Sequence, residues 1–196
     1  MANYASNVLA DNWTNRRTVS VDLLWVIGFS VLTALLAQVR IPLPFTPVPL
    51  TGQTLGVLLA GAVLGSRRGF ISQALYLAAG AAGLPVFAGG AFSLAYLLGP
   101  TGGYLWSFPV AAGLLGWLIE AGAGRRVWKL GAALVLSCGV VLASGALWLS
   151  ATRGVTIREA ALIGVYPFLP GEALKAILVM SSLPGILRRY PGGAAT

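Results

Sequence analysis

Six apolar runs, separated by short polar connections, constrain the fold of this 196-residue chain more than any other feature. The runs cover approximately residues 21–39, 53–65, 69–82, 104–121, 129–150 and 170–188. Only 9% of all residues are charged, whereas soluble domains carry about 25%. Because a bilayer admits few charges and only internally hydrogen-bonded backbone, the sequence predicts an all-α membrane protein with six transmembrane helices in one bundle.

The basic residues predict how this bundle is oriented. Nine of the 13 Lys and Arg residues flank the runs on one side, around residues 16–17, 67–68, 125–129 and 188–189. Cytoplasmic connections carry an excess of cations, so both termini are predicted to be cytoplasmic in a multi-pass protein of the cell (inner) membrane. The predicted organisation is a cytoplasmic N-terminal tail (1–20), a six-helix transmembrane domain (21–189) and a cytoplasmic C-terminal tail (190–196).

The composition argues against several functions. A formal charge of +8 would by itself fit nucleic-acid binding, but the cations form short clusters where membrane topology places them. Without histidine, the chain has no imidazole for catalysis or metal ligation, and Cys138 is interpreted as a small packing residue. The phosphate-binding pattern GxxxxGK is also absent, so any ATP hydrolysis would need another subunit. We therefore predict no catalytic residue, no metal and no cofactor.

Two connections on the predicted outer side are unusual for solvated loops. Residues 40–52 contain four prolines and cannot form a regular helix, and residues 83–103 carry no charge but many Gly, Pro and aromatic residues. Irregular backbone at membrane depth is tolerated where it is buried in protein or lines a cavity. We expect these outer loops to fold inward and cap a ligand pocket; a re-entrant plug without a ligand is the alternative.

Glu172 and Lys175 are charged residues inside the last apolar run. Their spacing of three places them on one helix face, where they can touch. Ionisable residues inside a membrane span are costly and usually mark function. In the alternative reading, Glu172 complements the positive helix end and Lys175 extends to the membrane surface. As a site, Lys175 would hold an anionic group and Glu172 would accept hydrogen bonds from ligand N–H groups.

Other polar or amphipathic residues fall near the same outer face. They are Gln53, Thr54, Tyr96, Tyr104 and Tyr166, and each has a structural reading beside a ligand-binding one. An enzymatic reading is weaker, because a Ser–Lys hydrolase needs an activated serine beside Lys175 and no local pattern marks one. Small residues at four-residue spacing, such as Ser30 and Ala34, indicate close helix packing, with docking of a membrane partner as the alternative.

Three segments carry a resemblance to a known family. They are IPLPFTPVPLTGQTLGVLLAGAVLGSRRG (41–69), YLAAGAAGLPVFAGGAFSLAYLLGPTGGYLWSFP (76–109) and YPFLPGEALKAIL (166–178). Together they resemble the signature segments of the BioY family, the biotin-binding S components of energy-coupling factor (ECF) transporters. The resemblance implies a six-helix bundle with an outward-facing biotin pocket. It also implies a transmembrane coupling protein and two ATPase subunits as partners.

The resemblance also implies roles for individual residues. Phe87, Gly89 and Gly90 of the PVFAGG segment are implied to line the pocket, and Ser30, Ala34 and Ala37 on the first helix are implied to dock the coupling protein. The family pattern in the last span is usually Asp followed by Lys, whereas this chain has Glu172. We expect a membrane subunit that captures biotin outside and delivers it to the cytoplasm. A self-sufficient carrier for a small organic anion is the main alternative, and a structural or assembly membrane protein is a third.

Overall fold

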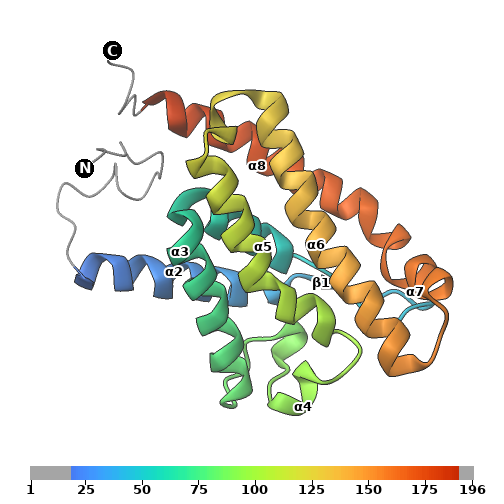
Figure 1. The fold of residues 1–196 in the computed structure, drawn as a ribbon. Helices are drawn as coiled ribbons and strands as arrows, with labels where there is room; N and C mark the ends of the chain where they lie inside the picture. The colour runs from blue at the N-terminus through green and yellow to red at the C-terminus, as the bar shows by residue number, and fades with distance from the viewer. Residues whose placement is uncertain (1–18, 190–196) are drawn as a thin grey trace.

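The computed structural model describes residues 19–189, with side chains described for residues 19–182. The predicted tails therefore lie outside the described residues, apart from the two residues that begin the first described helix. The longer elements are α2 (Val19–Gln38), α3 (Gln53–Ala81), α5 (Gly102–Glu120), α6 (Val127–Arg153), α7 (Ile157–Gly164) and α8 (Leu169–Arg189). The shorter ones are β1 (Arg40–Ile41), β2 (Leu50–Thr51), η1 (Ala88–Gly90), α4 (Leu94–Leu97), η2 (Ala123–Arg125) and η3 (Tyr166–Phe168). Figure 1 shows the long helices gathered into one bundle, which confirms the predicted fold class.

The long helix α3 reverses direction at Gly65, between the second and third predicted runs. Gly65 has φ 80° and ψ −174°, a backbone conformation open almost only to glycine. The two arms pack closely, since a Cβ atom on Gly69 would lie 3.1 Å from the Cα of Gly61. Figure 1 shows the change of direction within α3. The two short runs are thus the two arms of one helical hairpin.

Among the residues that the structure describes, five helices are long and apolar enough to cross a membrane, and α3 is one of them. This agrees with a multi-pass membrane protein. The predicted number of six spans treats each arm of α3 separately, and it stays a prediction. Each arm is shorter than the roughly 20 residues that a straight crossing requires.

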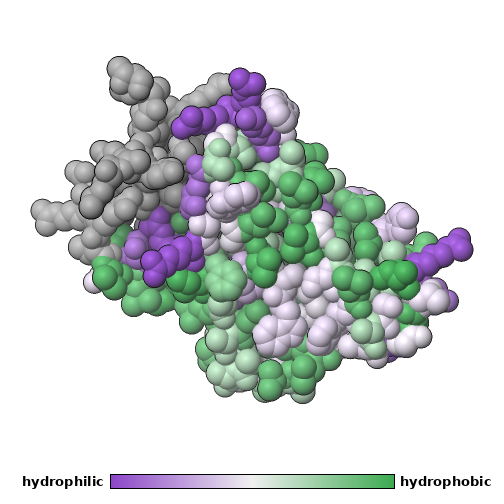
Figure 2. All heavy atoms as spheres, viewed as in Figure 1, coloured by the Kyte–Doolittle hydropathy of each residue, from purple (hydrophilic) through white to green (hydrophobic). Residues whose placement is uncertain are grey.

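The surface of the bundle is apolar where lipid would cover it. Leu24, Val135 and Leu147 are 71%, 69% and 62% exposed, although a water-soluble fold would bury such side chains. Figure 2 shows hydrophobic residues over most of the viewed face, with hydrophilic residues gathered mainly near its ends. This distribution is the one that a surrounding bilayer selects.

Both unusual outer connections cover one end of the bundle, as expected from the sequence. Residues 40–51 form a small antiparallel hairpin in which Arg40 pairs with Thr51, and Val48 in its loop is buried. In the second connection, Phe87 and Leu97 are completely buried. The apolar side chains that are directed inward explain why these loops carry no charge apart from that of Arg40.

The interior has two clusters of buried apolar residues. One lies beneath the capping loops and contains aromatic side chains such as Phe87, Tyr104 and Phe168. The other contains mainly aliphatic side chains, including Leu58, Leu115 and Leu134. The aromatic cluster surrounds the candidate site, while the aliphatic cluster fills other parts of the same helix bundle.

Candidate ligand-binding site

A chamber lies beneath the capping loops, among α3, α5, α6 and α8. Its lining combines apolar walls with a few polar groups, and the hairpin contributes Val48 and Pro49 while the second loop contributes Ala88 and Tyr96. The cavity volume is about 40 Å³ in this conformation. That is room for a few water molecules, so a larger solute has to displace side chains on entry.

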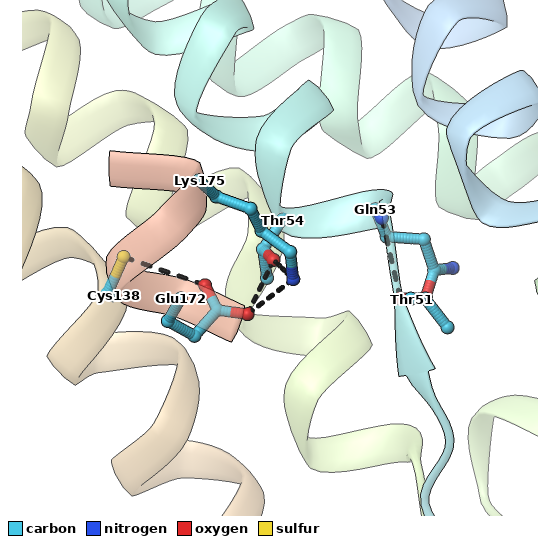
Figure 3. A network of polar contacts seen from close by, with 6 residues as sticks. All are labelled: Thr51, Gln53, Thr54, Cys138, Glu172 and Lys175. Carbon is cyan, nitrogen blue, oxygen red and sulfur yellow. Dashed lines mark hydrogen bonds and ion pairs between the residues drawn. The ribbon is translucent and has the colours of Figure 1, made fainter. Parts of the chain in front are cut away.

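Three polar side chains meet at one wall of the chamber, as Figure 3 shows. Lys175 Nζ donates to Glu172 Oε1 over 2.7 Å and to Thr54 Oγ1 over 2.6 Å. Thr54 Oγ1 in turn donates to the same Glu172 oxygen over 2.7 Å. The side chains of Lys175 and Glu172 are only 11% and 8% exposed. The predicted contact between the two charged residues is therefore confirmed, and Thr54 closes it into a triangle.

The second oxygen of the Glu172 carboxylate has a much weaker partner. Cys138 Sγ on α6 lies 3.7 Å from Glu172 Oε2, and a thiol is a poor donor. An ionised carboxylate can accept several hydrogen bonds, so this oxygen keeps capacity for a ligand N–H group. The arrangement fits the acceptor role expected for Glu172.

Local sequence explains where α8 begins and why Glu172 is tolerated there. Pro170 lies in the first turn, where the missing backbone N–H costs no helical hydrogen bond. Glu172 also lies in the first turn, close to the positive end of the helix dipole. Lys175 follows one turn later, so helix geometry alone brings the ammonium group to the carboxylate.

Gln53 and Thr51 form a second polar group at the start of α3. Thr51 Oγ1 donates to Gln53 Oε1 over 2.9 Å, and Gln53 Nε2 donates to the Tyr76 hydroxyl over 2.6 Å. Tyr76 then donates to the backbone carbonyl of Val86 over 3.2 Å. Gln53 lines the chamber, and its amide also joins the two arms of α3 through Tyr76, which in turn holds the second capping loop at Val86.

Aromatic rings form much of the remaining wall. Phe87 stacks on Tyr96 with ring centroids 5.3 Å apart and meets Tyr76 edge to face at 5.5 Å. Tyr104 packs against Phe168 at 6.2 Å and donates its hydroxyl proton to the carbonyl of Gly164 over 2.6 Å. Tyr96 and Tyr104 line the chamber directly, while Phe87 supports Tyr96 from behind.

Four residues expected to line the pocket do not line this chamber, and Phe87, described above, is one of them. Tyr166 is 61% exposed and does not line the chamber. Gly89 lies against the guanidinium group of Arg40, in a neighbouring hollow. Gly90 has no heavy atom within 4 Å of the position a Cβ would take. Both glycines have positive φ, 70° and 75°, so they shape the turn of the loop.

The three small residues expected to dock a partner face mainly inward. Ser30 and Ala37 are 6% and 0% exposed, and Ala34 packs against the aromatic cluster. On the same face of α2, the Cα of Thr33 lies 3.0 Å from the Cβ position of Gly56 on α3. Burial gives Ser30 and Ala37 a packing role, and their assignment to partner docking has no support from this geometry.

The chamber also includes residues that the sequence analysis did not single out. Phe168 and Thr51 are near Glu172 and Gln53 in the sequence, so proximity to these residues was a usable signal. Phe108, Val141 and Leu142 carried no such signal. Their helices are apolar on the lipid side as well as on the inner side, so composition does not separate the two.

A bundle of membrane helices with a chamber of this kind at one end defines the class of solute-binding membrane transport proteins. Comparison with known proteins names the family within that class. The chain belongs to the BioY family, whose model matches residues 9–192. Membership of a transporter family identifies the protein as a transporter rather than an enzyme.

Relatives match over most of their length. The "Probable biotin transporter BioY" of Pyrococcus horikoshii is 38% identical over 160 residues, which are 80% of this chain and 92% of the relative. The "Biotin transporter BioY" of Rhizobium etli is 35% identical over 176 residues, which are 82% of this chain and 94% of the relative. The family model, which matches residues 9–192, includes both capping loops and the helices around the chamber.

A solved structure shares the fold. It is the crystal structure at 2.1 Å of the S-component for biotin from an ECF-type ABC transporter. The two chains superpose with a TM-score of 0.80 at 29% sequence identity, over 92% of this chain and 95% of the other. The helical arrangement described above is therefore that of an S component.

Proposed function

We propose that this protein is the biotin-capturing membrane subunit of a vitamin uptake system and that biotin binds in the chamber beneath the capping loops. The observation that carries this proposal is the buried triangle of Glu172, Lys175 and Thr54 in a chamber with aromatic walls. Biotin has ureido N–H groups that need an acceptor, a carboxylate that attracts cations and a fused apolar ring system. The chamber offers a matching group for each of these features.

The buried ion pair supplies polarity without net charge. Desolvation strengthens each polar contact inside the chamber, so a ligand that satisfies Glu172 and Lys175 gains more there than in water. Binding of a solute that leaves Glu172 or Lys175 without a partner costs the desolvation free energy of that group, so the chamber discriminates against such solutes. Binding requires the walls to part, because the chamber in this conformation is small.

We further propose that uptake is coupled to ATP hydrolysis by a transmembrane coupling protein and two ATPase subunits. The likeness to an ECF S-component supports this step. The protein would lie in the cell (inner) membrane with both termini in the cytoplasm, as the distribution of basic residues favours. The chamber would then open to the outside.

Biotin binding by the purified chain in detergent tests the proposal. A ligand at about 100 times its dissociation constant stabilises the protein by about 2.7 kcal/mol, which raises the melting temperature. The thermal shift should be measured with biotin and with a carboxylate of similar size that lacks the ureido ring. An equal shift with both ligands, or none with biotin, would contradict the proposed function.

Reconstitution in liposomes separates coupled transport from independent transport. Liposomes that contain this chain alone should bind biotin and should not accumulate it in response to an ion gradient. Accumulation without ATP would favour the self-sufficient carrier and would remove the need for ATPase partners.

A further inference from the structure

A second hollow adjoins the chamber at the same end of the bundle. Its cavity volume is about 470 Å³, against about 40 Å³ for the chamber itself. We call it the vestibule and define it by Arg40, Gly89 and the residues that line both spaces, which include Pro49, Ala88 and Tyr96. Because these wall residues are shared, a solute in the vestibule is separated from the chamber by single side chains.

Arg40 gives the vestibule a positive charge. Its guanidinium group lies against Gly89, where a Cβ atom would overlap it, so the missing side chain makes room for the cation. Arg40 is exposed and forms no ion pair with any residue that the structure describes. Its N–H donors are therefore available to an anion that enters from water.

The charge in the chamber differs from that in the vestibule. Lys175 is mostly buried, with 11% of its side chain exposed, and is neutralised by Glu172 at 2.7 Å, so the pair projects little field to the outside. An exposed arginine can attract a solute before any buried contact forms. Its planar fork also matches the two oxygens of a carboxylate.

Tyr96 belongs to the wall between the two spaces and is held by a short element. Tyr96 lies in α4, a helix of only four residues, and its backbone N–H donates to the Ser93 hydroxyl oxygen. Ser93 has φ 95°, an unfavourable backbone conformation for a residue other than glycine. A one-turn helix next to a strained residue is easier to displace than the long helices around the chamber.

We propose that the vestibule is a first binding station for organic carboxylate anions, in which Arg40 holds the carboxylate and Tyr96 separates the anion from the chamber. This inference rests on the proposed function, since biotin is the carboxylate that would pass this way. In this proposal the contact with Arg40 is given up before the ligand reaches the chamber, so the loss of Arg40 should leave dissociation unchanged and should lower affinity only through slower association.

Stopped-flow binding tests the role of Arg40. The probes are biotin and its neutral amide, and the variants are Arg40→Ala and, as a matched control, Arg153→Ala at the end of α6. We expect Arg40→Ala to slow the association of biotin roughly tenfold, at the lower end of electrostatic rate effects, and to abolish its dependence on ionic strength. Association of the amide, dissociation of biotin and the melting temperature should not change, and Arg153→Ala should resemble the parent protein.

Three outcomes would overturn the assignment of Arg40. In the first, Arg40→Ala binds biotin at the parent rate. In the second, Arg40→Ala slows the association of the neutral amide as much as that of biotin. In the third, Arg40→Ala changes only the dissociation rate of biotin. In all three cases the parent protein still binds biotin, so the proposed function stands. If the parent protein does not bind biotin at all, the proposed function fails and the vestibule inference fails with it.

Tyr96→Ala tests the wall. Removal of the ring should accelerate both association and dissociation of biotin and of its amide by similar factors, because the barrier acts on either ligand. Slower association, or unchanged rates for both ligands, would exclude Tyr96 as the separating side chain.

Discussion

Thr54 and Glu172 lie 118 positions apart in the chain and share a 2.7 Å hydrogen bond at the wall of the chamber. The bond joins the start of α3 to the first turn of α8, and Lys175 donates to both of its oxygen atoms. Three side chains from two helices thus form one buried polar unit. Changing one of them alters the hydrogen bonding of the other two.

Removal of the Lys175 charge alone should destabilise the protein more than removal of both the Lys175 and the Glu172 charges. Lys175→Met leaves the Glu172 carboxylate buried without a counter-charge, which typically costs about 3–5 kcal/mol. The double variant Glu172→Gln with Lys175→Met should restore much of the lost melting temperature, because no uncompensated charge remains. Biotin binding, measured by calorimetry, should be lost in both variants.

Arg158→Ala is the control for these charge changes. Arg158 is an exposed cation in α7, outside the chamber, and its removal should leave biotin affinity unchanged. Equal loss of affinity at Lys175 and Arg158 would mean that the ligand does not bind in the chamber. Equal melting temperatures of Lys175→Met and of the double variant Glu172→Gln with Lys175→Met would mean that the two charges are not electrostatically coupled.

Replacement of the Thr54 hydroxyl by a methyl group should weaken the unit without changing its volume. Thr54→Val removes the donor to Glu172 and the acceptor for Lys175, and a buried group that loses its partner costs about 1–3 kcal/mol. We expect biotin affinity to fall about tenfold, which corresponds to about 1.4 kcal/mol. Thr54→Ser keeps the hydroxyl and should retain most of the affinity; if Ser and Val are equally impaired, the hydroxyl is not responsible.

Gly145→Ala should narrow the chamber by placing a methyl group behind the Tyr104 ring. A Cβ atom on Gly145 of α6 would overlap the Tyr104 ring, so Gly145→Ala should displace the ring and reduce biotin affinity. Overpacking of this kind typically costs about 1–3 kcal/mol of stability. Gly139→Ala on the same helix is the matched control, since no atom lies within 4 Å of its Cβ position. Equal biotin affinity in the two variants would contradict the role of Tyr104 as a chamber wall.

The reversal of α3 should depend on Gly116. A Cβ atom there would overlap the backbone of Gly65 and Ser66, which cannot move aside as a flexible side chain can. Gly116→Ala should therefore lower the melting temperature markedly. A Cβ atom on Gly113, one turn earlier, would lie 3.5 Å from the Phe70 side chain and 3.7 Å from the Ser66 carbonyl oxygen, which are ordinary contacts, so Gly113→Ala should be tolerated. Similar thermal stability of the two variants would show that the contact at Gly65 is not close-packed.

Several features were predictable because they follow local rules. The break between the second and third apolar runs agrees with the reversal at Gly65, since the runs were too short to cross a bilayer individually. Contact between Glu172 and Lys175 follows from helix periodicity. The inward folding of the two capping loops agrees with their low charge, since Arg40 is the single charged residue in 40–52 and 83–103.

Other features were not accessible from residue spacing. Ser30 and Ala37 could equally well have faced a partner or the bundle, and the structure buries them against neighbouring helices. Tyr166 is near Glu172 in the sequence but is 61% exposed, because it opens the short helix η3, whose last residue, Phe168, is the one that turns to the chamber. Phe108 is one of many apolar residues in α5, and nothing in its neighbours distinguishes the inner face from the lipid face.

The sequence by itself determined the class of solvent around this protein, the family and the presence of one ionisable pair in the last span, since these depend on composition, motif and spacing along the chain. Tertiary structure alone decided that Thr54 completes the pair, that Tyr96 stands between two cavities and that Arg40 faces the outer one. The physical reason is that lipid and protein interior are equally apolar. The sequence therefore shows that a side chain avoids water, but only the packing of helices shows what it meets instead.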